Sequence, residues 1–286
     1  PISNGAITVA AAKTATINSI LRYAHNTAAS VSVGSGGTLN LSGGTTASNN
    51  PQFAFTGVGA VNMIAGTYGS NIGSIGTSSF NQTGGTYNIT PGNGTGFNIN
   101  SATQNVAYNL SSGTLTVNGN ATVVNGVSNA HFGIGNGTST FTSSLNVSGS
   151  GIMNVGTTAG TYGEIRIGNA TASNGTFNVS GGTVTVGTGA IGNKIYFFKN
   201  GSSAGYTASM TQAAGTVTTN GIQFGVTAGT YDAASSATLT LSGGSLYVGA
   251  AGITRGTAAE GVVIQHHRLS QPVASASDRR IGGERS

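Results

Sequence analysis

The chain has no cysteine and no tryptophan, and charged residues fill only 5% of its 286 positions. Without cysteine there are no disulfide bridges, thiolate metal sites or cysteine nucleophiles. An average globular chain carries about 25% charged residues, so an ordinary cytosolic enzyme is not expected. No apolar run approaches the ~18 residues that a membrane helix needs, which predicts no membrane span. The chain starts at Pro1 without a signal-like segment, so we expect a processed, soluble product.

The few charges are unevenly placed. No Lys, Arg, Asp or Glu occurs between Arg22 and Glu164, and half of the ten basic residues lie from Arg255 onward. A nucleic-acid groove needs a basic stripe that follows the phosphates, and the body of this chain has none despite a formal net charge of +5. We therefore expect no nucleic-acid partner, and a charged, solvated tail over residues 265–286.

Small and turn-forming residues make up much of the chain. Glycine alone fills 49 positions, and serine, threonine and asparagine are abundant. These residue types disfavour helix. Hydrophobic residues still reach 37%, which is enough to fill a narrow, continuous core and too many for a disordered linker. The composition therefore predicts an all-β, repetitive architecture.

A ten-residue unit recurs along the chain, and residues 177–186 show it best. Apolar and polar residues alternate, a Gly-containing bend follows, and a second alternating stretch ends the unit, which is typical of two short strands joined at a corner. The sixth position is glycine in seven of eight copies, Ser150 being the exception. The first position is apolar in all eight copies: Leu39, Val61, Phe80, Tyr108, Leu145, Phe177, Met210 and Leu239.

A third short strand precedes the unit in the later copies, for example at Phe132–Ile134 and Ile165–Ile167. No single repeat can bury its own apolar face, so the repeats must stack. We predict a parallel β-solenoid over residues 24–264, with about three short strands per coil and eight to nine coils. Residues 1–23 are predicted to be a cap or assembly segment. In such a fold the eight first positions line up in one column.

The second position of the unit points away from that column and is asparagine in six copies. Identical amides stacked at the spacing of neighbouring strands can form a hydrogen-bonded ladder. The last two copies have Thr211 and Thr240 at this position. We therefore predict a surface ladder formed by Asn40, Asn62, Asn81, Asn109, Asn146 and Asn178.

Residues 16–23 (Thr-Ile-Asn-Ser-Ile-Leu-Arg-Tyr), residues 31–39 (Val-Ser-Val-Gly-Ser-Gly-Gly-Thr-Leu) and the later Ser-Gly-Gly-Thr units resemble secreted bacterial proteins with autotransporter-associated β-strand repeats. The resemblance covers residues 14–253. It implies export, a right-handed β-helix of the passenger type, and a role at the cell surface or in a matrix. The chain departs from that pattern in two ways, because no membrane-barrel segment follows the repeats and a charged tail does.

Two short motifs look like catalytic or nucleotide-binding signatures. Residues 201–205 match G-x-S-x-G, with Asp232 and His266 following in the order of an α/β-hydrolase triad, and residues 187–192 match G-x-G-x-x-G. In a chain so rich in glycine and serine, each match is expected about once by chance. Both signatures also need a helix directly afterwards, and strand-like residues follow instead. We predict no catalytic residue and no cofactor.

Other β-helices are polysaccharide lyases and hydrolases, so a carbohydrate-active enzyme is the alternative function. Such chemistry needs clustered carboxylates, and residues 24–253 contain only two, Glu164 and Asp232, far apart in sequence. Glu164 stands two residues from Arg166 on one predicted strand, and we expect the two to form a surface pair. The four histidines lack ligand spacing and acids are too few for calcium, so we predict no metal site.

A third hypothesis is ice binding. Thr-x-Thr pairs begin at Thr114, Thr183 and Thr216, as on the flat faces of ice-binding solenoids, but the array is interrupted at Gly151 and Tyr247. We therefore rank it below the enzyme.

The leading expectation is an extracellular structural protein, fibre-forming or adhesive and non-catalytic. Open sheet edges and uncharged sides favour association through many weak contacts. Its expected partners are copies of itself and surface glycans. The arginines of the tail are expected to bond to carbonyls of the same solenoid or of a neighbour: Arg268, Arg279, Arg280 and Arg285.

Overall fold

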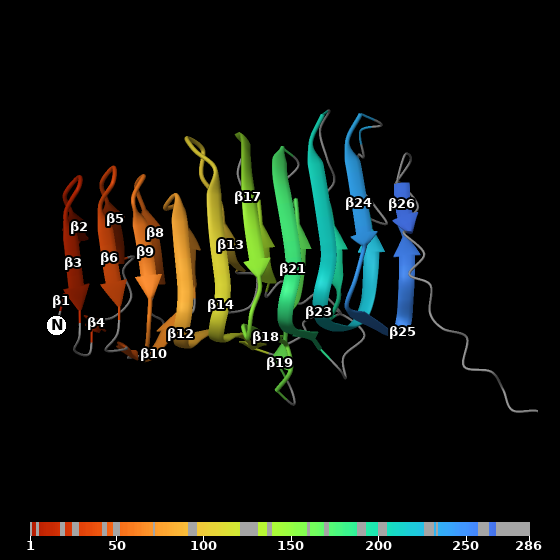
Figure 1. Cartoon of the computed structure of the whole chain (residues 1–286), viewed down its shortest axis with the longest axis horizontal. Helices are drawn as coiled ribbons and strands as arrows, with labels where there is room; N and C mark the ends of the chain where they lie inside the picture. Colours follow the sequence, from red (N-terminus) through yellow and green to blue (C-terminus); the bar gives the residue numbers. More distant parts are fainter. Residues whose placement is uncertain are drawn as a thin grey trace, which may run out of the picture.

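The structure is a computed structural model of the chain. It describes residues 2–3, 6–17, 21–24, 29–41, 45–47, 52–70, 72–90, 96–120, 131–135, 139–158, 161–168, 172–187, 193–199, 205–225, 232, 234–256 and 263–266. Within these ranges every regular element is a β-strand and none is a helix. The strands follow one another along the long axis, from β1 near the N-terminus to β26 (Figure 1). The predicted all-β class is confirmed.

Strands in equivalent places of successive repeats pair in parallel and form three columns. Column A carries the first half of the ten-residue unit and column B its second half. Column C carries the third strand predicted ahead of the unit. The chain visits them in the order C, A, B and then returns to C. The register partners are equivalent residues of neighbouring repeats, so side chains at equivalent positions are stacked on one another along each column.

The bounds of the strands follow these columns. Column A contains β3 (Thr14–Ile17), β6 (Thr38–Leu41), β9 (Ala60–Met63), β17 (Ser139–Val147), β24 (Ser236–Leu241), β26 (Val263–His266) and the first parts of β12 (Ser79–Ile89), β14 (Val106–Val117), β21 (Ser173–Val186) and β23 (Thr207–Phe224). Column B contains β1 (Ile2–Ser3), β4 (Leu21–Ala24), β7 (Thr45–Ala47), β10 (Thr67–Ser70), β18 (Ile152–Val155), the first part of β25 (Ser245–Arg255) and later parts of β12, β14, β21 and β23.

Column C contains β2 (Ala6–Val9), β5 (Ala29–Val33), β8 (Gln52–Thr56), β11 (Ile72–Ile75), β13 (Gly96–Ile99), β16 (His131–Ile134), β20 (Glu164–Ile167), β22 (Ile195–Phe197) and the last parts of β23 and β25. Outside the columns, β15 (Gly119–Asn120) and β19 (Thr161–Tyr162) form a short antiparallel pair.

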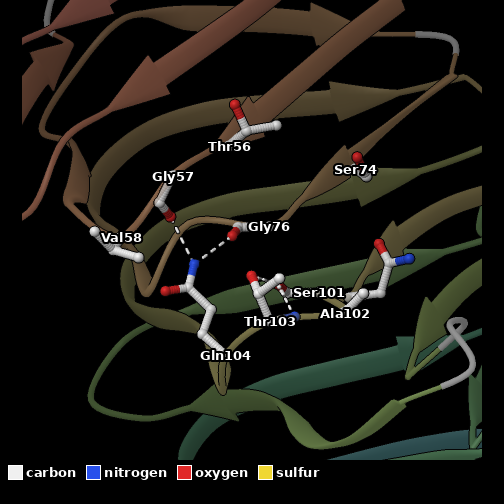
Figure 2. A pocket seen from close by; sticks show the side chains of 10 residues that line it. Thr56, Gly57, Val58, Ser74, Gly76, Ser101, Ala102, Thr103 and Gln104 are labelled. Atoms are coloured by element: carbon white, nitrogen blue, oxygen red, sulfur yellow. Dashed lines mark hydrogen bonds between the residues drawn. The ribbon is translucent and has the colours of Figure 1, made fainter.

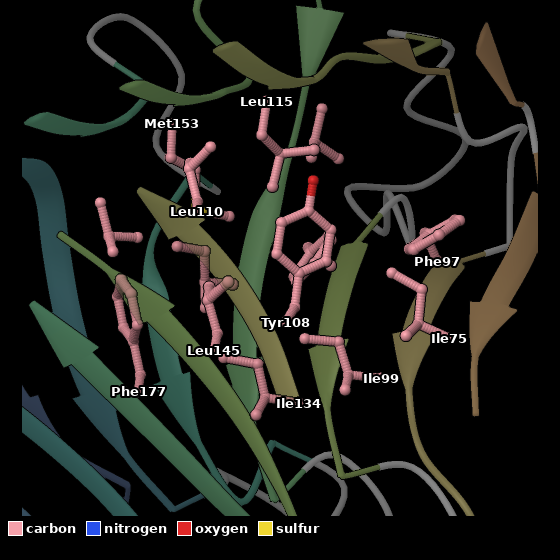
Figure 3. Close-up of a cluster of buried hydrophobic side chains, with 14 of the residues drawn as sticks. Ile75, Phe97, Ile99, Tyr108, Leu110, Leu115, Ile134, Leu145, Met153 and Phe177 are labelled. Carbon is pink, nitrogen blue, oxygen red and sulfur yellow. The ribbon is translucent and has the colours of Figure 1, made fainter. Parts of the chain in front are cut away.

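The apolar first positions of the unit line up as predicted. Each of the eight is the register partner of the next, from Leu39 with Val61 to Met210 with Leu239. Ala15 and Ile264 extend this column at its two ends. All eight side chains are buried, and Figure 3 shows three of them, Tyr108, Leu145 and Phe177, within the core. The core is therefore one continuous apolar column shared by the repeats.

The corner between columns A and B requires glycine. Gly182 has a φ of +70°, and a Cβ there would lie 2.2 Å from the carbonyl oxygen of Gly151 in the neighbouring repeat. Both the left-handed backbone and the close stacking exclude a side chain. In the exceptional copy the corner is one residue longer, because β17 ends at Val147 and β18 begins at Ile152. The positive φ then falls on Gly149, which leaves Ser150 free of that constraint.

The predicted N-terminal boundary can be compared with the strands of the structure. Residues 1–23, predicted to be a cap or assembly segment, contain β2 and β3, which pair in parallel with β5 and β6. This segment therefore carries the first strands of the stack. At the other end, residues 267–286 lie outside the described part of the chain, and with them most of the predicted tail.

Candidate functional site

The clearest surface feature is the asparagine ladder on column A. The Nδ2 atoms of Asn62, Asn81, Asn109, Asn146 and Asn178 each donate to the Oδ1 of the asparagine one repeat earlier, at 2.7–3.0 Å. At the N-terminal end, Asn40 Nδ2 lies 3.5 Å from Thr16 Oγ1. The six residues predicted from the sequence thus form one continuous chain of side-chain hydrogen bonds.

The rest of this face is neutral as well. The row beside the ladder is half-exposed serine, threonine and alanine where its exposure is described, and it contains Thr38, Ala60, Ser79, Ala107, Ser144, Thr176, Ser209 and Thr238. No charged side chain occurs in either row. A flat surface of amides and hydroxyls can make many weak, directional contacts without charge repulsion.

Removing one amide from the middle of the ladder tests its strength. Asn109→Ala leaves Asn81 without its donor and Asn146 without its acceptor, while water reaches the half-exposed site. We expect the free energy of unfolding to fall by about 1 kcal/mol, measured by urea denaturation. Thr211→Ala removes a side chain from the same row beyond the ladder and should change stability by less than about 0.5 kcal/mol. Equal effects would argue against the ladder as a source of stability.

A second feature is a buried ionic cluster on the outer side of column C. Glu164 lies at the start of β20 and is fully buried, although its side chain points away from the apolar core. Its carboxylate accepts from Arg166 Nε at 2.7 Å and from Lys199 Nζ at 2.5 and 2.6 Å. The Tyr162 hydroxyl also donates to it. Lys199 lies 4.4 Å from the centre of the Tyr196 ring, a cation–π contact.

Burial sets the protonation of this cluster. Burial lowers the pKa of Lys199 below its usual 10.5, while the charge of Glu164 opposes that shift. Burial raises the pKa of Tyr162 well above 10, and the Glu164 charge adds to the effect. Tyr196 has the same two causes in the same order, which raise its pKa to about 12. Both phenols therefore remain neutral hydrogen-bonding groups at neutral pH.

The raised pKa of Tyr196 gives a pH prediction. An unfolded tyrosine ionises near pH 10.0, whereas folded Tyr196 holds its proton until about pH 12. Its contribution to stability is complete below pH 10.0 and is lost as pH rises through about 12. We expect Tyr196→Phe to reduce the alkaline loss of stability in this interval, measured by denaturation at a series of pH values. An unchanged alkaline profile in the variant would contradict the assignment.

The arrangement of the cluster suits the linking of neighbouring repeats better than it suits catalysis. Its carboxylate is occupied by two cations and a phenol. The other acid in the part of the chain that the structure describes, Asp232, accepts from the Ala234 N–H at 2.8 Å at a turn before β24. His131 is buried and is the register partner of Glu164. The expected pairing of Glu164 with Arg166 is confirmed, but its expected place on the surface is wrong, because both side chains are buried.

A third feature is a cleft of about 330 Å³ at the corner between columns C and A (Figure 2). The loop from Asn100 to Gln104 folds back over two earlier corners. Gln104 Nε2 donates to the carbonyls of Gly57 and Gly76 at 2.6 and 2.7 Å, and its Oε1 accepts from Ser78. The amide therefore fastens three repeats together. The remaining lining is uncharged, with hydroxyls from Thr56, Ser74, Ser101 and Thr103.

The other candidates from the sequence have mixed outcomes. The tail arginines Arg268, Arg279, Arg280 and Arg285 and residues 201–204 lie outside the described residues. Of the G-x-G-x-x-G segment at residues 187–192, only Gly187 is described. Across the part of the chain that the structure describes, no three His, Cys, Asp or Glu side chains gather as a metal site, and no helix is long and apolar enough to cross a membrane.

Comparison of the chain with protein-family models, with curated proteins and with solved structures finds no match in any of the three. The functional argument therefore rests on the faces and clusters described above.

Proposed function

We propose that this protein is an extracellular, non-catalytic structural protein of the bacterial surface or matrix, which adheres or assembles into fibres through the neutral sides of a β-solenoid. The proposed solenoid is right-handed, with three short strands per coil and eight to nine coils. The observation that carries this proposal is the column A face, where a hydrogen-bonded ladder of six amides is combined with a row of small neutral residues.

The distribution of charge supports adhesion over catalysis. The acid with the most polar neighbours, Glu164, is sealed from solvent and neutralised by Arg166 and Lys199. The extended faces, by contrast, present repeated neutral groups at the spacing of neighbouring strands, about 4.8 Å. A periodic partner, such as another copy of the chain or a polysaccharide, can match that spacing over many repeats. Many weak contacts then add up to strong attachment.

Assembly is tested by electron microscopy of the purified protein, with a light-scattering measurement of its size in solution. We expect filaments or regular bundles at high protein concentration. A matched variant, Asn81→Asp with Asn146→Asp, places two carboxylates on the ladder face and should reduce lateral association through repulsion. Truncation after His266, where β26 ends, tests whether the tail contributes. Monodisperse particles with no affinity for surfaces, polysaccharides or each other would refute the proposed function.

A further inference from the structure

The outer face of column B differs from the ladder face in its hydrogen bonding. On column A the amides bond to one another, whereas column B carries threonine rows whose hydroxyls make no hydrogen bond within the described part of the chain. Thr114, Thr183 and Thr216 lie in one row, and Thr116, Thr185 and Thr218 in the next. Each pair comes from one strand and points to the same side. These groups are available to an external partner.

An exposed aromatic ring interrupts the second row at its C-terminal end. Tyr247 of β25 is the register partner of Thr218 and is 60% exposed, the highest value among the large apolar side chains described. A cleft of about 200 Å³ lies beside it, lined by Thr218, Asn220 and the backbone of Gly187 and Gly249. Glycine is required at 187, where φ is +35° and a Cβ would lie 2.1 Å from Asn193 Cβ, and a Cβ on Gly249 would lie 3.1 Å from Asn220 Oδ1.

The composition of this surface selects among possible ligands. An exposed tyrosine offers a flat apolar face with a polar edge, and the neighbouring rows offer hydroxyl donors and acceptors at a fixed spacing. No charged residue occurs on the outward rows of column B from β12 to the first part of β25. A neutral polysaccharide has both matching features, since its rings present C–H faces and its edges present hydroxyls.

The face that carries the threonine rows is not regular enough to favour binding to ice. The longer corner places Ile152, rather than Gly151, in register with Thr114 and Thr183, and this side chain is exposed. Tyr247 also projects from the face. Both residues break a flat hydroxyl lattice, whereas a glycan chain can pass an apolar side chain or stack on it.

We propose that the cleft beside Tyr247, continued by the threonine rows of column B, binds a neutral polysaccharide. Tyr247 stacks on a sugar ring, Thr218 and Asn220 bond to its hydroxyls, and the threonines of earlier repeats bind the following sugars. This inference rests on the proposed adhesive function and names the partner class and the face that binds it.

The test measures depletion of the protein by insoluble cellulose and by an insoluble β-1,3-glucan, with soluble dextran and polygalacturonate as competitors. The wild type should bind at least one of the two neutral solids. Tyr247→Ala should weaken this binding by about tenfold, and Tyr247→Phe by no more than about threefold, because the ring face is kept. Thr216→Val with Thr218→Val should give an intermediate loss while preserving side-chain shape.

Ile253→Ala is the matched control, because Ile253 is a 40% exposed apolar residue of the same strand on column C. It should bind like the wild type, and melting temperatures should show that every variant is folded. The inference is overturned if neither solid binds the protein, if Tyr247→Ala binds as well as the wild type, if only polygalacturonate competes, or if Tyr247→Ala instead dissociates an oligomer. Filaments that form normally without binding either solid would refute this inference and leave the proposed structural function standing.

Discussion

Replacing Phe177 with alanine is expected to lower the free energy of unfolding by about 3–5 kcal/mol, the usual cost of deleting a buried phenyl ring. Phe177 is fully buried in the middle of column A, and its register partners are Leu145 and Met210. The neighbouring backbones are fixed by hydrogen bonds on both sides, so the cavity has little room to collapse. Urea denaturation followed by far-ultraviolet circular dichroism measures the change.

Phe141→Ala is the control for this substitution, because Phe141 lies on β17 in the same region and is 38% exposed. Its removal should cost only about 1–2 kcal/mol, because 38% of the side chain is already exposed and water can fill the space that is left. In a stacked repeat protein, stability is a sum of neighbour interfaces, so Phe177→Ala should also allow the two halves of the stack to unfold separately. Similar losses in both variants would contradict a single shared core.

Replacing Glu164 with glutamine is expected to cost about 3–5 kcal/mol, because it removes one partner from a buried ion pair and leaves charged groups uncompensated. Arg166 is 4% exposed and Lys199 24%, so water reaches only the lysine to an appreciable degree. Thermal unfolding of the two proteins at one pH measures the difference. Asp232→Asn is the matched control, because its amide oxygen can still accept from the Ala234 N–H.

The pH dependence of the Glu164→Gln variant separates lost charge from lost packing. Lys199 already has a lowered pKa in the folded protein, so the folded state binds this proton less tightly than the unfolded state does. Stability contributed by Lys199 therefore rises as pH increases toward 10.5, where the unfolded lysine also loses its proton. The Glu164 charge opposes the lowering of this pKa, so the pKa of Lys199 is lower still in the Glu164→Gln variant. The variant therefore gains more stability than the wild type as pH rises, and the difference in free energy of unfolding between the two should shrink. Adding Lys199→Met should recover part of it at neutral pH, and a deficit indifferent to both changes would point to packing.

The stacked core could be predicted from the alternating apolar pattern of the ten-residue unit. Positions such as Leu39 and Phe177 alternate with polar residues, and only one way of stacking buries all of them. The ladder follows from the same register, since Asn40 and Asn178 stand one residue further along. The longer corner at Gly149 was not anticipated, which is why Gly151 rather than Ile152 was expected to interrupt the threonine row.

The ionic cluster and the clefts were harder to predict, because they depend on irregular segments. Lys199 lies in a turn after β22, 35 residues from Glu164 in sequence, and no repeat position brings the two together. Gln104 likewise comes from a loop between Ile99 and Val106 that is longer than the corresponding corners of the two preceding repeats. Aligning the third strands would have placed Arg166 beside Tyr196 and so indicated a polar contact between repeats. The burial of that contact depends on the folded chain.

The amide ladder has a direction. Every Nδ2 points toward the N-terminal end of the stack and every accepting oxygen toward the C-terminal end, from Asn178 back to Asn40. Aligned dipoles in a hydrogen-bonded chain polarise one another, so this flank of the molecule has an electrical polarity along its length. Two molecules lying side by side would therefore be attracted when antiparallel and repelled when parallel, which gives any lateral sheet of them an alternating order.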